Sequence, residues 1–128
     1  MELKGRPIVP GKLSGKSLVS KRPISFLGDI DPETGKIIAE NHPLNGVSIS
    51  NRVFTFPSGK GSTVGSYVIY QLFKNKKAPL AIINQDAEPI IIVGAIISEI
   101  PMVCNIDVNL IPNNIEVSLD AEKGVINF

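Results

Sequence analysis

The feature that most constrains the fold is a single change of hydrophobic period, which falls at a glycine-rich stretch after Pro57. Before this point, short runs of β-type residues are separated by glycine, proline and turn residues. After it, Val64, Val68 and Leu72 recur at helical spacing. The sequence therefore predicts a mainly β fold with α, in which the glycine-rich loop joins a strand to a helix.

The β-type segments are short, and the structure is expected to contain many strands. The candidate strands cover residues 3–9, 13–20, 23–27, 36–39, 47–49, 52–56, 79–84, 101–104, 106–110, 115–119 and 125–128. Two helices are expected, over about residues 63–74 and from Glu88 to about Glu99. Gly15 marks a bulge or a close approach inside its strand. No repeat or linker interrupts the pattern, so we expect one domain over residues 1–128.

Composition excludes several classes of protein. The 13 basic and 12 acidic residues nearly cancel, and aromatic residues make up only 5% of the chain, which argues against a nucleic-acid partner. The longest apolar run covers residues 89–97, about half of the ~18 residues that a membrane span needs, so no membrane association is expected. The mean hydropathy of +0.18 is high for a small chain and predicts both an aliphatic core and some apolar surface that meets a partner.

The chain holds one cysteine, Cys104, and one histidine, His42. These two residues exclude a disulfide and exclude a zinc or iron–sulfur site built by this chain alone, so we expect no metal ligands and no cofactor here. A lone cysteine suits a reducing cytoplasm, and Cys104 is expected to be an inert buried thiol. Asp29 and Asp31 are interpreted as turn formers, because Thr34 stands where a calcium loop requires glycine.

The candidate functional centre is the loop that follows Pro57, which we call the serine loop (residues 59–63, GKGST). Its two glycines allow the backbone to approach a ligand closely, and a helix N-terminus favours negative charge at Ser62. The simpler alternative is that Ser62 or Thr63 only caps the helix. A Walker A loop is excluded because Gly61 separates Lys60 from Ser62.

Two polar residues outside the loop keep alternative roles. His42 precedes a proline in a loop, which fixes its geometry, although a solvated loop histidine is the commoner case. Glu88 is either a simple helix N-terminal acid or part of a segment that faces the same cleft as Ser62.

Five segments follow one another along the chain: residues 11–20 (GKLSGKSLVS), 23–32 (PISFLGDIDP), 42–44 (HPL), 57–66 (PSGKGSTVGS) and 87–90 (AEPI). Together they resemble the small subunit of the aconitase X family, in its archaeal phosphomevalonate dehydratase branch. The resemblance implies a swivelling β/β/α domain of the aconitase type, with a barrel-like sheet and two packed helices. Two positions depart from the family: Lys60 stands where arginine is common, and Asp29 stands where a second glycine is common.

The resemblance also implies an activity and a partner. The branch removes water from (R)-5-phosphomevalonate to give trans-anhydromevalonate 5-phosphate, in a modified mevalonate route to isoprenoids. Ser62 would be the proton acceptor, and a large catalytic subunit would hold the [4Fe-4S] cluster. The expected contacts to the small anionic substrate come from Gly59, Lys60, Gly61, Thr63, Ser66 and His42. The alternatives are a small subunit of another aconitase X dehydratase, for example one acting on hydroxyproline, and a non-catalytic anion-binding regulatory domain.

Overall fold

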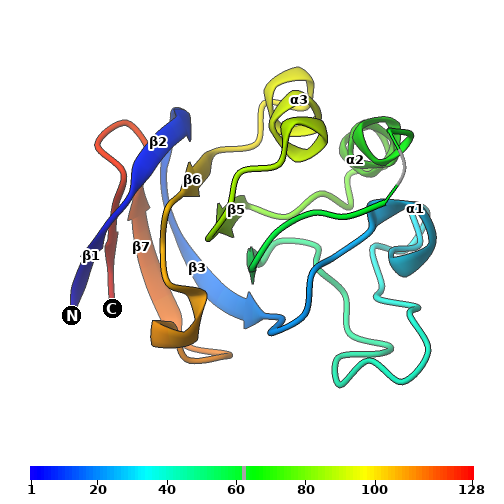
Figure 1. Ribbon diagram of the computed structural model, residues 1–128, viewed down its shortest axis with the longest axis horizontal. Helices are drawn as coiled ribbons and strands as arrows, with labels where there is room; N and C mark the ends of the chain where they lie inside the picture. The colour runs from blue at the N-terminus through cyan, green and yellow to red at the C-terminus, as the bar shows by residue number, and fades with distance from the viewer. Residues whose placement is uncertain (62) are drawn as a thin grey trace.

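The structure, a computed structural model, describes residues 1–61 and 63–128; Ser62, the expected proton acceptor, lies outside the described residues. Its strands form one sheet in the order β1-β8-β7-β3-β4-β5-β6-β2 (Figure 1). Their bounds are β1 (Glu2–Lys4), β2 (Arg6–Val9), β3 (Lys12–Val19), β4 (Val53–Phe56), β5 (Ala81–Asn84), β6 (Met102–Cys104), β7 (Glu116–Asp120) and β8 (Val125–Asn127). The helices are α1 (Phe26–Asp29), α2 (Gly65–Lys74), α3 (Pro89–Ile97) and the 3₁₀ helix η1 (Val108–Leu110).

Two stretches of chain connect the antiparallel part of the sheet to its parallel part. The first half of β3 pairs antiparallel with β7, and residues Ser17 to Val19 pair parallel with β4. Similarly, β1 pairs with β8, whereas β2, directly after Gly5, pairs with β6. A Cβ at Gly5 would overlap the carbonyl oxygen of Cys104, so only glycine allows the chain to pass this close. The sheet curves into the barrel-like form that the resemblance implies, and the mainly β fold predicted from the sequence pattern is confirmed.

The core has two layers because β4 and β5 are buried on both faces. Successive side chains of a strand point to opposite faces. Phe54 and Phe56 of β4 therefore pack toward the helices, and their rings lie 6.2 and 5.9 Å from that of Phe26. Val53, on the other face, belongs to a second cluster with Val117 and Ile126 between the two parts of the sheet.

The three labelled α-helices of Figure 1 lie together on one side of the sheet. α2 and α3 pack closely because Gly94 faces Ile69: a Cβ on this glycine would lie 2.5 Å from Ile69 Cδ1. α2 starts at Gly65, two residues later than predicted. α3 carries no charged residue, and it leaves Val93, Ile96 and Ile97 about half exposed. None of the helices in the described part of the chain has the length and hydropathy to cross a bilayer.

Several predicted strands are wrong. The segment 23–27 was predicted as a strand, but it leads into α1, because Gly28 adopts a φ of +102° and the Asp29 carboxylate accepts a hydrogen bond from the Ser25 N–H (2.9 Å). The described residues therefore contain three α-helices rather than the two that were predicted. The predicted strand 3–9 is divided at Gly5 into β1 and β2. The segments 36–39 and 47–49 make only isolated bridges.

The segment 106–110 was also predicted as a strand and instead contains η1. Asp107 accepts a hydrogen bond from the Asn109 N–H (3.0 Å), which caps this short helix. Ile106 and Val108 are still buried, whereas Leu110 is 47% exposed, so the apolar alternation reported the burial of its first two residues correctly and the backbone conformation wrongly. Gly15 is a close approach, as expected, since a Cβ there would lie 2.5 Å from Leu80 Cδ1.

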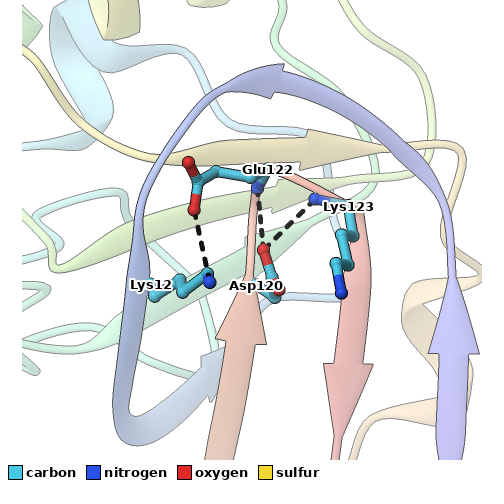
Figure 2. A network of polar contacts seen from close by, with 4 residues as sticks. All are labelled: Lys12, Asp120, Glu122 and Lys123. Atoms are coloured by element: carbon cyan, nitrogen blue, oxygen red, sulfur yellow. Dashed lines mark hydrogen bonds and ion pairs between the residues drawn. The ribbon is translucent and has the colours of Figure 1, made fainter.

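A turn over residues 121–124 joins β7 to β8 (Figure 2). Its geometry is held by the Asp120 carboxylate, which accepts hydrogen bonds from the N–H groups of Glu122 and Lys123 at 3.0 and 3.2 Å. Lys12 on β3 lies 3.6 Å from the Glu122 carboxylate. Both side chains are more than half exposed, so this ion pair contributes little to stability.

Candidate functional site

The candidate site lies at the carboxyl ends of the parallel strands β3, β4 and β5. Residues 20–22 follow β3, the serine loop follows β4, and residues 85–88 follow β5. Figure 1 shows the chain after β4 running toward α1. In α/β sheets this edge is where ligands bind.

The start of the serine loop is fixed by backbone hydrogen bonds to both neighbouring segments. Ile24 donates its N–H to the Ser58 carbonyl, and Lys60 donates to the Ile24 carbonyl, both at 3.0 Å. On the other side, the Pro57 carbonyl accepts from the N–H groups of Gln85 and Asp86. The loop therefore enters the site on a rigid base.

The two glycines of the serine loop are required by protein contacts. A Cβ at Gly59 would lie 2.5 Å from Ile91 Cγ1 and 3.1 Å from the Glu88 carboxylate. Gly61 has a φ of +92°, and a Cβ there would lie 2.6 Å from Ser25 Oγ. Glu88 thus lies against the base of the loop, consistent with the reading in which its segment faces the site.

The end of the loop is open to solvent. Thr63 is exposed, and its carbonyl accepts a hydrogen bond from Ser66 Oγ at 3.2 Å. Lys60 is exposed as well, and Lys12–Glu122 is the only ion pair found in the described part of the chain. The Lys60 ammonium is therefore available to a ligand.

A cleft of about 440 Å³ opens beside the serine loop. Its lining residues are Arg22, Pro23, Gly28, Asp29, Ile38, Ala39, Glu40, His42 and Lys60. The cleft brings together two of the predicted site residues, Lys60 and His42. The others, Gly59, Gly61, Thr63 and Ser66, do not line it.

His42 forms a buried wall of this cleft, so the interpretation as a solvated loop histidine is wrong. Its Nδ1 accepts a hydrogen bond from the Leu44 N–H at 3.0 Å, which leaves the ring proton on Nε2 to be donated to Ser20 Oγ at 3.0 Å. Burial, together with the nearby Arg22 charge, lowers the pKa of His42, although Asp29 opposes the shift. The imidazole is therefore held neutral, and both of its nitrogens are occupied by protein groups.

Arg22 is the site residue that sequence reasoning missed. Ser20 Oγ donates to the Arg22 carbonyl (2.9 Å) and accepts from the Arg22 N–H (3.2 Å), which fixes this backbone directly after β3. The guanidinium donates one hydrogen bond, from Nη1 to the Asn41 carbonyl at 2.9 Å. The available signal was its position, since Arg22 follows a predicted strand at the same edge of the sheet as the serine loop.

The remaining candidates have structural roles. Asp31 accepts hydrogen bonds from the Glu33 N–H and from Thr34 Oγ1, both at 3.0 Å, as a turn former does. Cys104 is buried in β6, and burial raises the pKa of its thiol. Among the described residues, no three His, Cys, Asp or Glu side chains gather as a metal site would require.

A barrel-like sheet with the α-helices on one side, and a charged cleft at the ends of its parallel strands, defines a domain of the β/β/α class. The sequence profile of the aconitase X swivel domain matches residues 2–128, and the chain belongs to this family. The resemblance read from the sequence is therefore confirmed.

Curated relatives match over most of the chain. The phosphomevalonate dehydratase small subunit of Thermococcus kodakarensis is 52% identical over 128 residues, which cover 100% of this chain and 96% of that protein. The protein of the same name from Methanosarcina acetivorans is 60% identical over 103 residues, 80% of this chain and 72% of that protein. The crystal structure of Thermococcus kodakaraensis aconitase X in its holo form superposes with a TM-score of 0.97 at 51% identity, covering 99% of this chain and 97% of that one.

Proposed function

We propose that this chain is the small subunit of a two-subunit dehydratase that converts (R)-5-phosphomevalonate into trans-anhydromevalonate 5-phosphate. The observation that carries the proposal is full-length similarity to proteins that bear this name, in a chain whose residues 57–60 are fixed by backbone hydrogen bonds at the carboxyl edge of the sheet. The reaction breaks a C–H bond next to the carboxylate and the C–O bond of the 3-hydroxyl group. The electron pair of the C–H bond forms the double bond, and the departing hydroxide leaves as water after protonation.

We assign Ser62 as the base for this step. A helix N-terminus stabilises an anion by about 0.3–1 kcal/mol, or about 2 kcal/mol in a favourable buried site. At about 1.4 kcal/mol per pKa unit, this lowers the pKa of a hydroxyl by one or two units at most, too little for a serine near neutral pH. The Lys60 ammonium and cationic groups of the partner must supply the remainder, in a site closed to water.

The other predicted contacts divide into direct and indirect ones. Lys60 is exposed in the cleft, so we assign it to an anionic group of the substrate, as a point charge. His42 has no free ring nitrogen, so we assign it to shaping the cleft wall. Gly59 and Gly61 hold the loop against Ile91 and Ser25, and Thr63 and Ser66 stand at the approach to α2.

The proposal requires a large subunit. An iron–sulfur cluster does not fit this chain, because its single cysteine is buried in β6 and several thiolates are needed. We therefore assign the [4Fe-4S] cluster to the large subunit. The half-exposed apolar side chains of α3 are consistent with such a partner. We place the assembly in the cytoplasm, where a lone cysteine stays reduced.

The deciding experiment compares Ser62→Ala with Ser58→Ala in the complex reconstituted with the large subunit. We expect Ser62→Ala to abolish dehydration of phosphomevalonate while co-purification with the large subunit is unchanged. Ser58→Ala removes a hydroxyl four residues earlier and should keep activity. Turnover that survives largely intact in Ser62→Ala would refute the base assignment. If the complex dehydrated hydroxyproline and not phosphomevalonate, the substrate assignment would be wrong, while the assignment of the chain to a dehydratase would stand.

A further inference from the structure

Arg22 lines the cleft, but the proposed reaction assigns it no role. Its guanidinium has five N–H donors, and the described structure gives it one protein partner, the Asn41 carbonyl. It forms no ion pair within the described residues, although Asp29 and Glu40 line the same cleft. An arginine held in a polar cleft with most of its donors unused is arranged to bind an oxyanion.

The position of Arg22 is set by a buried hydrogen-bonded chain. Ser20 Oγ holds both the carbonyl and the N–H of Arg22, and the neutral imidazole of His42 donates to the same Ser20 oxygen. Ser20 and His42 are both buried. The backbone of Arg22 is therefore fixed at the edge of the cleft, and the guanidinium is directed by its hydrogen bond to the Asn41 carbonyl.

The cleft has room for a large oxyanion. Its volume of about 440 Å³ is roughly 15 times the ~30 Å³ share of one water molecule. Lys60 approaches the cleft from the serine loop, while Arg22 approaches from the segment after β3. Asp29 is already engaged with the Ser25 N–H, so its charge is partly satisfied.

We propose that Arg22 binds the terminal phosphate of the substrate, and that Ser20 and His42 are the residues that position it. This inference rests on the proposed function. The carbon that loses its proton is bonded to the carboxylate, so the base must work at the carboxylate end. The other end of the molecule, which carries the phosphate, then extends into the cleft. The guanidinium fork matches phosphate oxygens in a bidentate way that a lysine cannot.

The test uses the reconstituted complex with phosphomevalonate and compares Arg22→Gln, Arg22→Lys and the matched control Lys21→Gln. Lys21 is the exposed neighbour of Arg22 and does not line the cleft. Because a hydrogen bond to a charged group is worth ~1.5–3 kcal/mol, Arg22→Gln should raise KM about 10- to 100-fold while kcat changes much less. The KM of Arg22→Lys should lie between those of Arg22→Gln and wild type, and the KM of Lys21→Gln should match that of wild type. Inorganic phosphate should inhibit wild type competitively and Arg22→Gln more weakly.

The outcomes separate this inference from the proposed function. If wild type turns over phosphomevalonate and Arg22→Gln raises KM no more than Lys21→Gln, the inference is overturned and the function stands. If wild type does not turn over phosphomevalonate, the proposed function is refuted. Titration of the full chain with inorganic phosphate, and separately with acetate, then shows whether Arg22 binds phosphate. Phosphate should shift the Arg22 Nε NMR resonance more strongly than acetate does. No phosphate shift, or a stronger response to acetate, would overturn the inference.

Discussion

Replacing Gly61 by alanine should destabilise the fold by more than the conformational cost of the substitution alone. Gly61 has a φ of +92°, a conformation that costs an alanine about 1–2 kcal/mol. The new Cβ would also lie 2.6 Å from Ser25 Oγ, which donates a hydrogen bond to the Leu27 carbonyl at 2.8 Å. Losing that bond adds about 0.5–1.5 kcal/mol, so the free energy of unfolding should fall by roughly 1.5–3.5 kcal/mol.

Gly46→Ala is the matched control. Gly46 has nearly the same φ, +88°, but no atom lies within 4 Å of the position that its Cβ would occupy. This variant should lose only the conformational part, about 1–2 kcal/mol. The assay is urea unfolding followed by far-UV circular dichroism, because the chain has no tryptophan to report by fluorescence. At a typical slope of ~1–3 kcal/mol per M urea, the difference between the variants is a measurable shift in midpoint.

A double-mutant cycle isolates the contact itself. In Gly61→Ala combined with Ser25→Ala, the Oγ contact is absent and the nearest remaining Ser25 atom, Cβ, lies 3.3 Å away. The two substitutions together should therefore cost less than the sum of their separate effects. If Gly61→Ala lost no more stability than Gly46→Ala, or if the cycle were additive, the close packing of the serine loop on Ser25 would be refuted.

Three further predictions concern the buried groups. The folded state lowers the pKa of His42 below its ordinary value of about 6.5, so the unfolded state binds more protons. The urea midpoint should therefore fall as the pH drops below that value. The dependence of the midpoint on pH should be weaker in His42→Gln. Gly94→Ala places a Cβ 2.5 Å from Ile69 Cδ1 between α2 and α3, and such overpacking should cost about 1–3 kcal/mol in the same unfolding assay; an unchanged midpoint would show that the helices separate freely. The Cys104 thiol, whose pKa is raised by burial, should react with a thiol reagent in urea and only slowly in the native protein, and rapid native labelling would contradict its burial.

The sequence predicted the fold class because burial dominates its pattern. β4 and β5 are buried on both faces, and their largely apolar sequences, VFTF and AIIN, indicate it. The errors fall where a local polar contact outweighs that pattern. Asp29 bonded to Ser25 produces α1, and Asp107 bonded to Asn109 produces η1. Apolar periodicity cannot report such side-chain caps.

The candidate site was predictable only as far as its parts are close in sequence. The serine loop is one continuous segment, and its glycines identify it. Arg22 lies 38 residues before Lys60 in the sequence and reaches the same cleft only because β3 and β4 are parallel neighbours. His42 was found as a residue, but its burial depends on Ser20, which belongs to another segment. Contacts of this kind require the register of the sheet, which the sequence alone did not provide.

Figure 1 shows the two ends of the chain side by side, on the opposite side of the molecule from α1. The Phe128 N–H donates to the Met1 carbonyl at 3.0 Å. A few glycines could therefore join the ends into a circularly permuted protein, with new termini opened in the turn after Asp31. Such a permutant would carry its attachment point for a spectroscopic label on the side of α1 and the cleft, while the original ends offer a second label at the far side. Combined with a label on a partner, the two positions would report a motion of this domain as two changes in distance, one from each side of the molecule.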